Sequence, residues 1–294
     1  MKKITVSIII LNWNGIENTK KCLDSLLIIH DVAYEVIVID NGSRVDEAAE
    51  LKKIYTTKIT VYRQTENTGF TGGCNLGITQ AKKNNPDFYL LLNNDTQVTP
   101  PFLKELIQTA RSNKKIGIVS PVIYDSKREN ILFSGGSINW FLGKTFHKKE
   151  YLIKVKANEF ITGCCFLIKK QVIESIGLLD KQFFAYFEDA AYCISARKAG
   201  YYCVCAPRAI IFHQQTASSD KRGPFNTYLM ARNRILFVNN YAPKVIKYYF
   251  FFFNALKLII AFSFFLITRQ QERAYAYYKG YLDGTLGRGG VPRI

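Results

Sequence analysis

The chain has 294 residues, of which 48% are hydrophobic and 21% are charged. This composition excludes an intrinsically disordered chain, and the length is sufficient for one large domain or two smaller ones. The formal net charge is +17, and from Arg208 onward there are 13 basic and three acidic residues. We therefore expect an anionic partner for this part of the chain. No known nucleic-acid-binding module is present, so a membrane surface is favoured over nucleic acid.

Strand and helix patterns alternate in the first third of the chain. Apolar, β-branched runs predict strands at residues 6–11, 35–40, 59–63 and 88–92. Helices are expected at residues 17–27 and 46–55, up to Lys82 after a glycine-rich turn, and from Pro101 onward. This order predicts an α/β fold with a mostly parallel sheet and helices on both faces. Ligands bind such sheets at the strand ends, where Asn12, Asp40 and Asp95 occur.

A glycine-rich segment runs from Asn67 to Gly77. We interpret residues 67–73 as a turn that leads into a helix. Backbone amides without side-chain bulk suit the approach of a diphosphate or a sugar. A tight turn that only allows close helix packing fits the pattern equally well, and the sequence leaves both interpretations open.

The remaining chain is expected to form two regions, over residues 1–215 and 216–294. The first continues with strand patterns at 116–124 and 160–169, a helix at 189–199 and extended segments at 201–206 and 210–213. The second begins with a helix from Pro224 to about residue 240. The seven cysteines have neither zinc-site nor disulfide spacing, so we expect buried, reduced thiols. We read the N-terminal apolar run as a strand and not as a signal peptide, which places the domain in the cytosol.

Residues 245–268 are the most apolar segment. The segment is long enough to cross a bilayer, which takes roughly 20 residues. Asn254 and Lys257 interrupt it, and Lys244, Lys247 and Arg269 flank it. A helix lying in the membrane interface avoids burying these charges, so we favour it. A true membrane span and a helix buried in a homodimer remain as alternatives.

Three groups of residues suggest chemistry. Asp95 follows a buried strand beside the glycine-rich segment, which suits Mg²⁺ or Mn²⁺ carrying phosphates, although Asp95 could also cap the next helix. Glu188 and Asp189 follow the aromatic run 183–187 and could supply a general base or a plain helix cap. His213 ends an apolar segment, and a lone histidine is more often structural than functional.

Together, the motifs resemble family 2 glycosyltransferases of the GT-A fold, particularly bacterial rhamnosyltransferase-like members. The resemblance extends from about residue 4 to residue 240, with the motifs in order and at family-like spacing. The segments that carry it are 12–15 (NWNG), 40–43 (DNGS), 67–75 (NTGFTGGCN), 93–95 (NND), 162–163 (TG), 183–189 (FFAYFED), 197–201 (RKAGY), His213, Tyr228 and 232–233 (RN).

The resemblance implies a role for each matching residue. Asp40 would bind the nucleotide base. Asp95 and His213 would bind the metal, Mg²⁺ or Mn²⁺. Asp189, with Glu188 beside it, would be the base of a single inverting displacement. The rest of the donor site would comprise Asn12, Asn14, Ser43, Asn67, Gly69, Gly73, Asn75 and Asn94.

The expected enzyme moves a sugar from a nucleotide-diphosphate donor to a cell-surface glycan. Rhamnose from a dTDP donor is the first expectation and a hexose from UDP the second. The acceptor is expected to be linked to a polyprenyl diphosphate, which places a bacterial enzyme at the cytoplasmic face of the membrane. One residue departs from the family, because Ala191 stands where a further Asp is expected. The alternative hypothesis is therefore an impaired or engineered-inactive subunit that binds nucleotide sugars as a scaffold.

Overall fold

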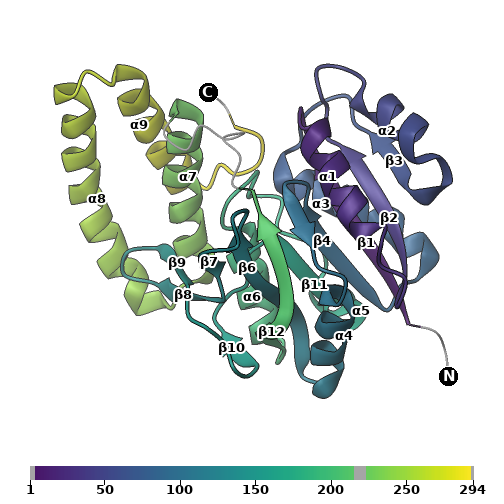
Figure 1. Cartoon of the computed structure of the whole chain (residues 1–294). Coiled ribbons are helices and arrows are strands. Elements are labelled where there is room, and N and C mark those ends of the chain that lie inside the picture. Colours follow the sequence, from purple (N-terminus) through teal and green to yellow (C-terminus); the bar gives the residue numbers. More distant parts are fainter. Residues whose placement is uncertain (1–3, 215–222, 293–294) are drawn as a thin grey trace.

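The computed structural model describes residues 4–214 and 223–292, which form a central sheet with helices on both faces and a helical layer at one side (Figure 1). The main sheet has the order β10-β12-β6-β11-β4-β1-β2-β3, with β5 paired to β12 and β7 paired to β6. The strands of this sheet are β1 (Thr5–Asn12), β2 (Ala33–Asp40), β3 (Thr60–Arg63), β4 (Phe88–Asn93), β5 (Thr96–Val98), β6 (Ile116–Asp125), β7 (Ile131–Phe133), β10 (Lys156–Asn158), β11 (Cys165–Lys169) and β12 (Tyr202–His213).

The expectation of a mostly parallel sheet is confirmed. Strand β1 lies between β2 and β4 and is parallel to both, and β3 is parallel to β2. Strands β6 and β12 are parallel to each other. Strand β11 is antiparallel to β4 and β6, so it reverses direction in the middle of the sheet. The carboxyl ends of β1, β2 and β4 therefore meet at one edge.

Helices cover the two faces of the sheet. They are α1 (Ile16–Leu26), α2 (Glu47–Tyr55), α3 (Gly69–Ala81), α4 (Phe102–Ser112), α5 (Lys170–Ile176) and α6 (Glu188–Lys198). A separate two-stranded hairpin is formed by β8 (Gly135–Asn139) and β9 (Lys144–Lys148). The sequence analysis missed α5, this hairpin and the short strands β5, β7 and β10. Each of these elements is too short for its apolar residues to show a helix or strand period.

Two expected elements have different boundaries in the structure. The expected turn at residues 67–73 is mostly helix, since α3 begins at Gly69. Gly73 faces β1 so closely that a Cβ there would lie 2.1 Å from Leu11 Cδ1, so close helix packing accounts for this glycine. The expected strand at 160–169 is shortened to β11, because the backbone of Thr162 to Cys164 turns toward a cavity described below.

Three helices form the layer at the side of the sheet: α7 (Pro224–Tyr241), α8 (Lys244–Ile267) and α9 (Gln271–Thr285). Helix α7 joins the main core through Phe237, which contacts Phe187 with ring centroids 5.2 Å apart. Helix α9 packs along α7, where the Tyr228 hydroxyl donates to Asp283 at 2.8 Å. The expected boundary at 215/216 lies outside the described residues. Helix α7, which follows it, is packed against the first region.

Ala191 lies on the core side of α6. Its side chain is fully buried within the main hydrophobic cluster, with Ala190, Tyr192 and Cys193. Successive helical residues are rotated by about 100°, so positions 189 and 191 face nearly opposite directions. An aspartate at position 191 would therefore enter the core and could not assist Asp189 directly.

We expect Ala191→Asp to destabilise the protein. An unpaired carboxylate in an apolar core costs about 3–5 kcal/mol. Thermal or urea unfolding would measure the loss, with Ala49→Asp as the control, because Ala49 is exposed in the first turn of α2. Equal stability of the two variants would show that position 191 tolerates a charge and that its side chain is not held in the core.

Candidate functional site

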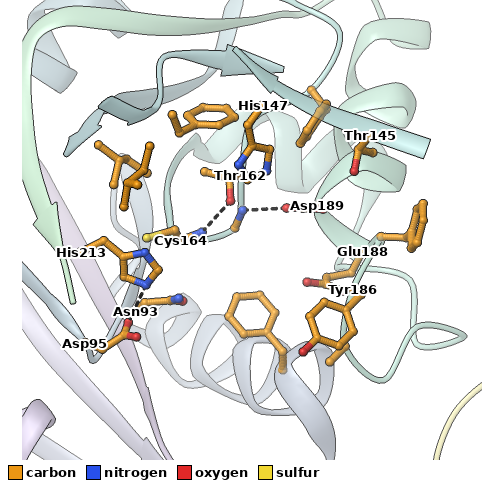
Figure 2. A pocket seen from close by; sticks show the side chains of 18 of the residues that line it. Asn93, Asp95, Thr145, His147, Thr162, Cys164, Tyr186, Glu188, Asp189 and His213 are labelled. Atoms are coloured by element: carbon orange, nitrogen blue, oxygen red, sulfur yellow. Dashed lines mark hydrogen bonds and ion pairs between the residues drawn. The ribbon is translucent and has the colours of Figure 1, made fainter. Parts of the chain in front are cut away.

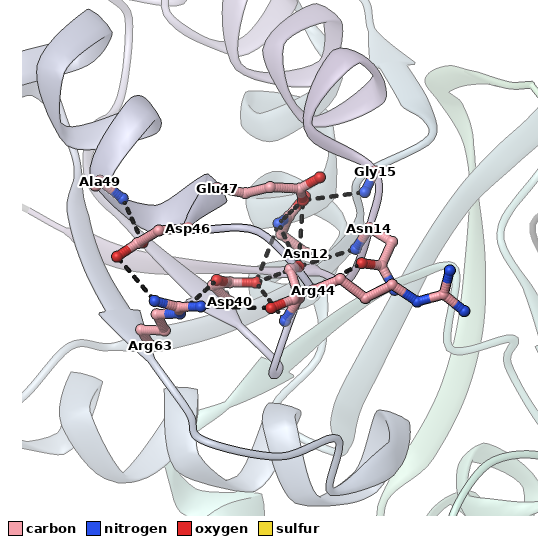
Figure 3. A network of polar contacts seen from close by, with 10 residues as sticks. Asn12, Asn14, Gly15, Asp40, Arg44, Asp46, Glu47, Ala49 and Arg63 are labelled. Carbon is pink, nitrogen blue, oxygen red and sulfur yellow. Dashed lines mark hydrogen bonds and ion pairs between the residues drawn. The ribbon is translucent and has the colours of Figure 1, made fainter.

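A buried polar network joins the ends of β1 and β2 (Figure 3). Asn12 and Asp40 are register partners at these ends, and both are fully buried. The Asn12 amide donates to Glu47 at 2.7 Å and to Asp40 at 3.3 Å, while its carbonyl accepts from the Thr19 hydroxyl at 2.6 Å. The side chain of Asn12 is thus used inside the protein, where it positions Asp40. Glu47 is as much a part of the network as Asn12, but no motif in the sequence analysis pointed to it.

One carboxylate oxygen of Asp40 lacks a hydrogen-bond donor within the described part of the chain. Its Oδ1 accepts from the Ser43 hydroxyl at 2.5 Å. Its Oδ2 is buried and has no hydrogen-bond partner among the described residues, with Arg63 Nε 3.6 Å away. An unmatched buried acceptor is costly unless a donor arrives. The Ser43 hydroxyl also accepts from the Asn14 backbone N–H at 2.9 Å, so Ser43 ties the loop after β1 to the loop after β2.

The other expected donor-site residues have structural contacts. Asn67 accepts from the Gly69 N–H at 2.8 Å and so orders the start of α3. Gly69 has a φ of +77°, and a Cβ there would lie 2.2 Å from the Phe184 carbonyl oxygen, so no other residue fits. Asn75 is buried and bonds both the N–H and the carbonyl of Leu179. Asn94 donates to the Thr19 hydroxyl at 2.9 Å.

Asp95 and His213 are brought together by the sheet. Strand β5 pairs with the end of β12, with Thr96 opposite His213. His213 Nε2 consequently lies 3.0 Å from Asp95 Oδ1, although 118 residues separate them in sequence. The His213 side chain is 20% exposed and that of Asp95 is 14% exposed, so both can still reach a ligand. Among the described residues no group of three or more His, Cys, Asp or Glu side chains is placed to hold a metal ion.

Glu188 and Asp189 begin α6 after two residues with positive φ, Tyr186 and Phe187. Asp189 Oδ2 accepts from the Gly163 N–H at 2.9 Å, and its Oδ1 accepts from the Ala190 N–H at 2.7 Å. Burial raises the pKa of Asp189, and these N–H groups oppose the rise because they stabilise the charged form.

Glu188 differs from its neighbour because its Oε2 is buried and has no hydrogen-bond partner among the described residues. Burial, followed by the nearby Asp189 charge, raises the pKa of Glu188 well above its ordinary range. The two environments therefore separate the acids: Asp189 is the more readily ionised, and Glu188 holds its proton to higher pH.

One cavity of about 500 Å³ joins these two groups. Figure 2 shows Asp95 and His213 on one side and Glu188 and Asp189 on the other. Aromatic rings and small polar groups complete the wall, which includes Phe70, Asn93, Phe133, Thr145, His147, Phe160, Thr162, Tyr186 and Met230. The sequence analysis missed His147, which lies on β9. Burial and the charge of Lys149 lower the pKa of His147, so its imidazole is neutral at physiological pH.

The sequence is similar to those of known proteins. A family model for glycosyl transferase family 2 matches residues 7–177. The chain is 29% identical over 251 residues to the low-salt glycan biosynthesis hexosyltransferase Agl10 of Haloferax volcanii, which covers 82% of this chain and 78% of that protein. It is 22% identical over 151 residues to the N-acetylglucosaminyl-diphospho-decaprenol L-rhamnosyltransferase of Mycobacterium tuberculosis, covering 46% of this chain and 49% of that one.

The fold is also shared with solved structures. The mannosyltransferase PcManGT of Pyrobaculum calidifontis, solved in complex with GDP-Man and Mn²⁺, superposes with a TM-score of 0.61 at 12% identity over 97% of this chain and 88% of that one. The expected GT-A fold is thus confirmed. The family match covers more than half of the chain, from the first strand to α5. The chain therefore belongs to glycosyl transferase family 2 and is a glycosyltransferase.

Proposed function

We propose that this glycosyltransferase moves a hexose, with rhamnose the first candidate, from a nucleotide-diphosphate donor to a glycan on a membrane lipid. The observation that carries the proposal is the single cavity with Asp95 and His213 on one side and Glu188 and Asp189 on the other. Transfer to a hydroxyl needs charge neutralisation at the leaving group and a proton acceptor at the nucleophile. The two sides of this cavity offer these functions separately.

The nucleoside would bind at the ends of β1 and β2. Once the side chains that bury it move aside, the Oδ2 of Asp40 would accept from a ring N–H of the base, which thymine, uracil and guanine all carry. Asn12, Ser43 and Glu47 hold Asp40 in place through the network described above. The diphosphate and sugar would then extend past the end of β4 toward Asp95. Asn14, Asn67 and Asn94 would act by shaping the surrounding loops.

The residues at Asp95 and His213 fit a divalent cation. One carboxylate and one imidazole, both partly accessible, leave most coordination positions for diphosphate oxygens and water. The mixed oxygen and nitrogen donors favour Mn²⁺ over Mg²⁺, which prefers oxygen ligands alone. A bound cation would neutralise charge on the leaving diphosphate. Asp95 and His213 would turn from each other to the cation, because their contact uses the same atoms that would bind it.

Asp189 would take the proton from the acceptor hydroxyl. Its two backbone hydrogen bonds hold the carboxylate in one orientation at the cavity wall. Glu188, protonated beside it, could donate a hydrogen bond to the acceptor sugar. Thr145, His147 and Phe160 also line the cavity, with the rings of His147 and Phe160 5.9 Å apart, and we call these three residues the acceptor wall. Aromatic faces and a neutral imidazole suit contact with a sugar ring and its hydroxyls.

A membrane-bound acceptor is supported by α8. Among the described residues α8 is the one helix long and apolar enough to cross a membrane by length and composition. Its inner side, however, contacts α7, where Arg234 donates to Asn254 at 2.5 Å. A helix held to the protein along one side and apolar on the other suits shallow insertion at the cytoplasmic membrane surface. The relative from M. tuberculosis is named for a decaprenyl-diphosphate-linked acceptor, which is consistent with this proposal.

The scaffold hypothesis has less support. That hypothesis was based on Ala191, and the Ala191 side chain lies in the core and does not line the cavity. The acidic residues expected for metal binding and proton transfer both reach the cavity. A catalytic role therefore accounts for more of the structure than donor binding alone.

We expect Asp95→Asn to abolish the Mn²⁺-dependent part of donor-nucleotide affinity, because the substitution removes the negative charge of the side chain and keeps its shape. His213→Ala should weaken it less, since a neutral nitrogen contributes less to a hard cation. Titration calorimetry with dTDP, UDP and GDP, with and without Mn²⁺, would measure both effects and identify the nucleotide that the enzyme prefers. Asp31→Asn, at an exposed loop position, is the matched control. Unchanged Mn²⁺-dependent affinity in Asp95→Asn would remove Asp95 from the metal site.

We expect Asp189→Asn to slow transfer by a factor of about 10²–10⁴ at saturating donor, the usual contribution of a general base. Glu188→Gln should slow transfer less, because glutamine resembles the protonated acid. Donor affinity should stay unchanged in both variants, which calorimetry would check. If Glu188→Gln were the inactive variant and Asp189→Asn the active one, the two roles would have to be exchanged.

We also expect Glu188→Gln to stabilise the protein increasingly as the pH rises. The raised pKa means that the folded state keeps this proton to higher pH than the unfolded chain. The parent therefore loses stability as the pH rises from about 4.3, the ordinary pKa of Glu, through the folded-state pKa. The melting temperatures of variant and parent should converge at pH 4 and diverge at pH 8. A constant difference across this range would contradict a raised pKa for Glu188.

A further inference from the structure

The turn of the β8–β9 hairpin presents two apolar side chains outside the core. Phe141 is 58% exposed and Leu142 is 50% exposed. Two hydrogen bonds close the turn: the Leu142 N–H donates to the Asn139 side chain at 3.0 Å, and the Gly143 N–H donates to the Trp140 carbonyl at 3.3 Å. A closed turn that keeps large apolar groups in contact with water calls for an explanation.

The hairpin is fixed to the helical layer by the residues on either side of its tip. Trp140 stacks on Phe237 of α7, with ring centroids 5.1 Å apart and planes 8° apart. Gly143 has a φ of +57°, and a Cβ there would lie 2.7 Å from Phe250 of α8. Trp140 and Gly143, on either side of the tip, thus pack against the helices, and Phe141 and Leu142 face outward. The tip is held in a constant position relative to α8.

The tip is continuous with the exposed side of α8. The Phe141 and Tyr249 ring centroids lie 6.4 Å apart, and Ile246 lines a shallow depression together with Trp140 and Phe141. The exposed side of α8 continues this surface with Val245, Tyr248, Phe252, Phe253, Ile259 and Ile260. Figure 1 shows the hairpin beside α8, on the side of the molecule opposite α2 and β3.

Lysines surround this apolar surface, and acidic residues are missing from both segments that form it. No Asp or Glu occurs in residues 139–149 or in residues 241–271. Lys247 and Lys257 are only partly exposed, and their spacing places them on the same side of α8 as Phe250 and Asn254. The exposed side can therefore enter hydrocarbon without burying a lysine there, while Lys144, Lys148 and Lys149 lie on β9 or next to it.

We propose that Phe141 and Leu142 insert together with α8 into an anionic phospholipid surface, so that the enzyme contacts the membrane at two fixed places. This inference rests on the proposed membrane-bound acceptor and deepens it. A second contact beside α8 limits how far the protein can tilt about that helix. A second copy of this chain is the poorer occupant, because the same surface on another copy has no acidic residues to meet these lysines.

The orientation has a direct consequence for transfer. Strand β9 continues from the tip to Thr145 and His147, which belong to the acceptor wall of the cavity. Insertion of the tip therefore holds this wall next to the lipid headgroups. A sugar attached to a lipid diphosphate would reach Asp189 without leaving the bilayer surface.

The test uses the full chain and vesicles of phosphatidylglycerol and phosphatidylcholine at low salt. Phe141→Glu/Leu142→Glu removes the tip, and Ile28→Glu/Ile54→Glu is the control with the same charge change at two exposed positions of the first region. We expect sedimentation to show at least about tenfold weaker vesicle affinity for the tip variant only, since burying a large apolar side chain is worth about that much. Melting temperatures of both variants should stay near that of the parent.

A second readout reports the position of the tip directly. The chain has two tryptophans, so Trp13→Phe leaves Trp140 as the single reporter beside Phe141. Brominated phospholipids should quench Trp140 emission in this background, and the tip substitutions should remove the quenching. Transfer to a lipid-linked acceptor should fall in the tip variant, while the affinity for the donor nucleotide stays the same.

The outcomes separate this inference from the proposed function. Tight vesicle binding by the tip variant, with no quenching of Trp140 in the parent, would overturn the inference and leave the membrane-bound acceptor in place. Failure of the parent itself to bind the vesicles would overturn both. A parent that is dimeric in light scattering and a tip variant that is monomeric would show that this surface binds a second copy, which also overturns the inference.

Discussion

The short antiparallel pairing of β5 with β12 brings Asp95 and His213 together on one side of the cavity. Only three residue pairs form it, from Val98 opposite Ile211 to Thr96 opposite His213. The Gln214 N–H extends the pairing by donating to the Asp95 carbonyl at 2.8 Å, and the Thr99 hydroxyl donates to the Ile210 carbonyl at 2.8 Å. Backbone hydrogen bonds thus define how far His213 lies from Asp95. The two residues need not be neighbours in sequence, because the sheet brings them together.

The buried carboxylates of the first region differ in their hydrogen bonding. Asp40 Oδ1 and Glu47 Oε2 accept hydrogen bonds from Asn12 and Ser43 within the protein. Glu188 has no such donor for Oε2 among the described residues, and the pKa of its carboxyl rises. Matched acids suit a rigid binding surface, whereas a poorly solvated acid beside a better solvated one suits proton transfer. The acids proposed for donor binding and those proposed for proton transfer therefore differ in how the protein solvates them.

The β8–β9 hairpin relates the helical layer to the cavity. One end of the hairpin is anchored on α7 by Trp140, and residues of β9 line the acceptor wall. The hairpin therefore connects the surface of α8 and helix α7 with the wall of the cavity. The basic, aromatic part of the chain thus follows the family domain in sequence and packs against it in space.

The sequence by itself determined the alternation of strands and helices, the polar residues at strand ends and the family, because buried parallel strands and helices have distinct periods and the motifs are local. It placed Asp40, Asp95, Asp189 and His213 at element ends, where the structure also has them. Only the tertiary structure decided which of these meet, since pairing over 118 residues leaves no local signal. It also decided that Asn12 supports Asp40 from inside and that Ala191 faces the core, because position in a strand or helix does not reveal which side becomes buried. Glu47, His147 and the exposed hairpin tip gained their importance in the same way, through neighbours that only the folded chain supplies.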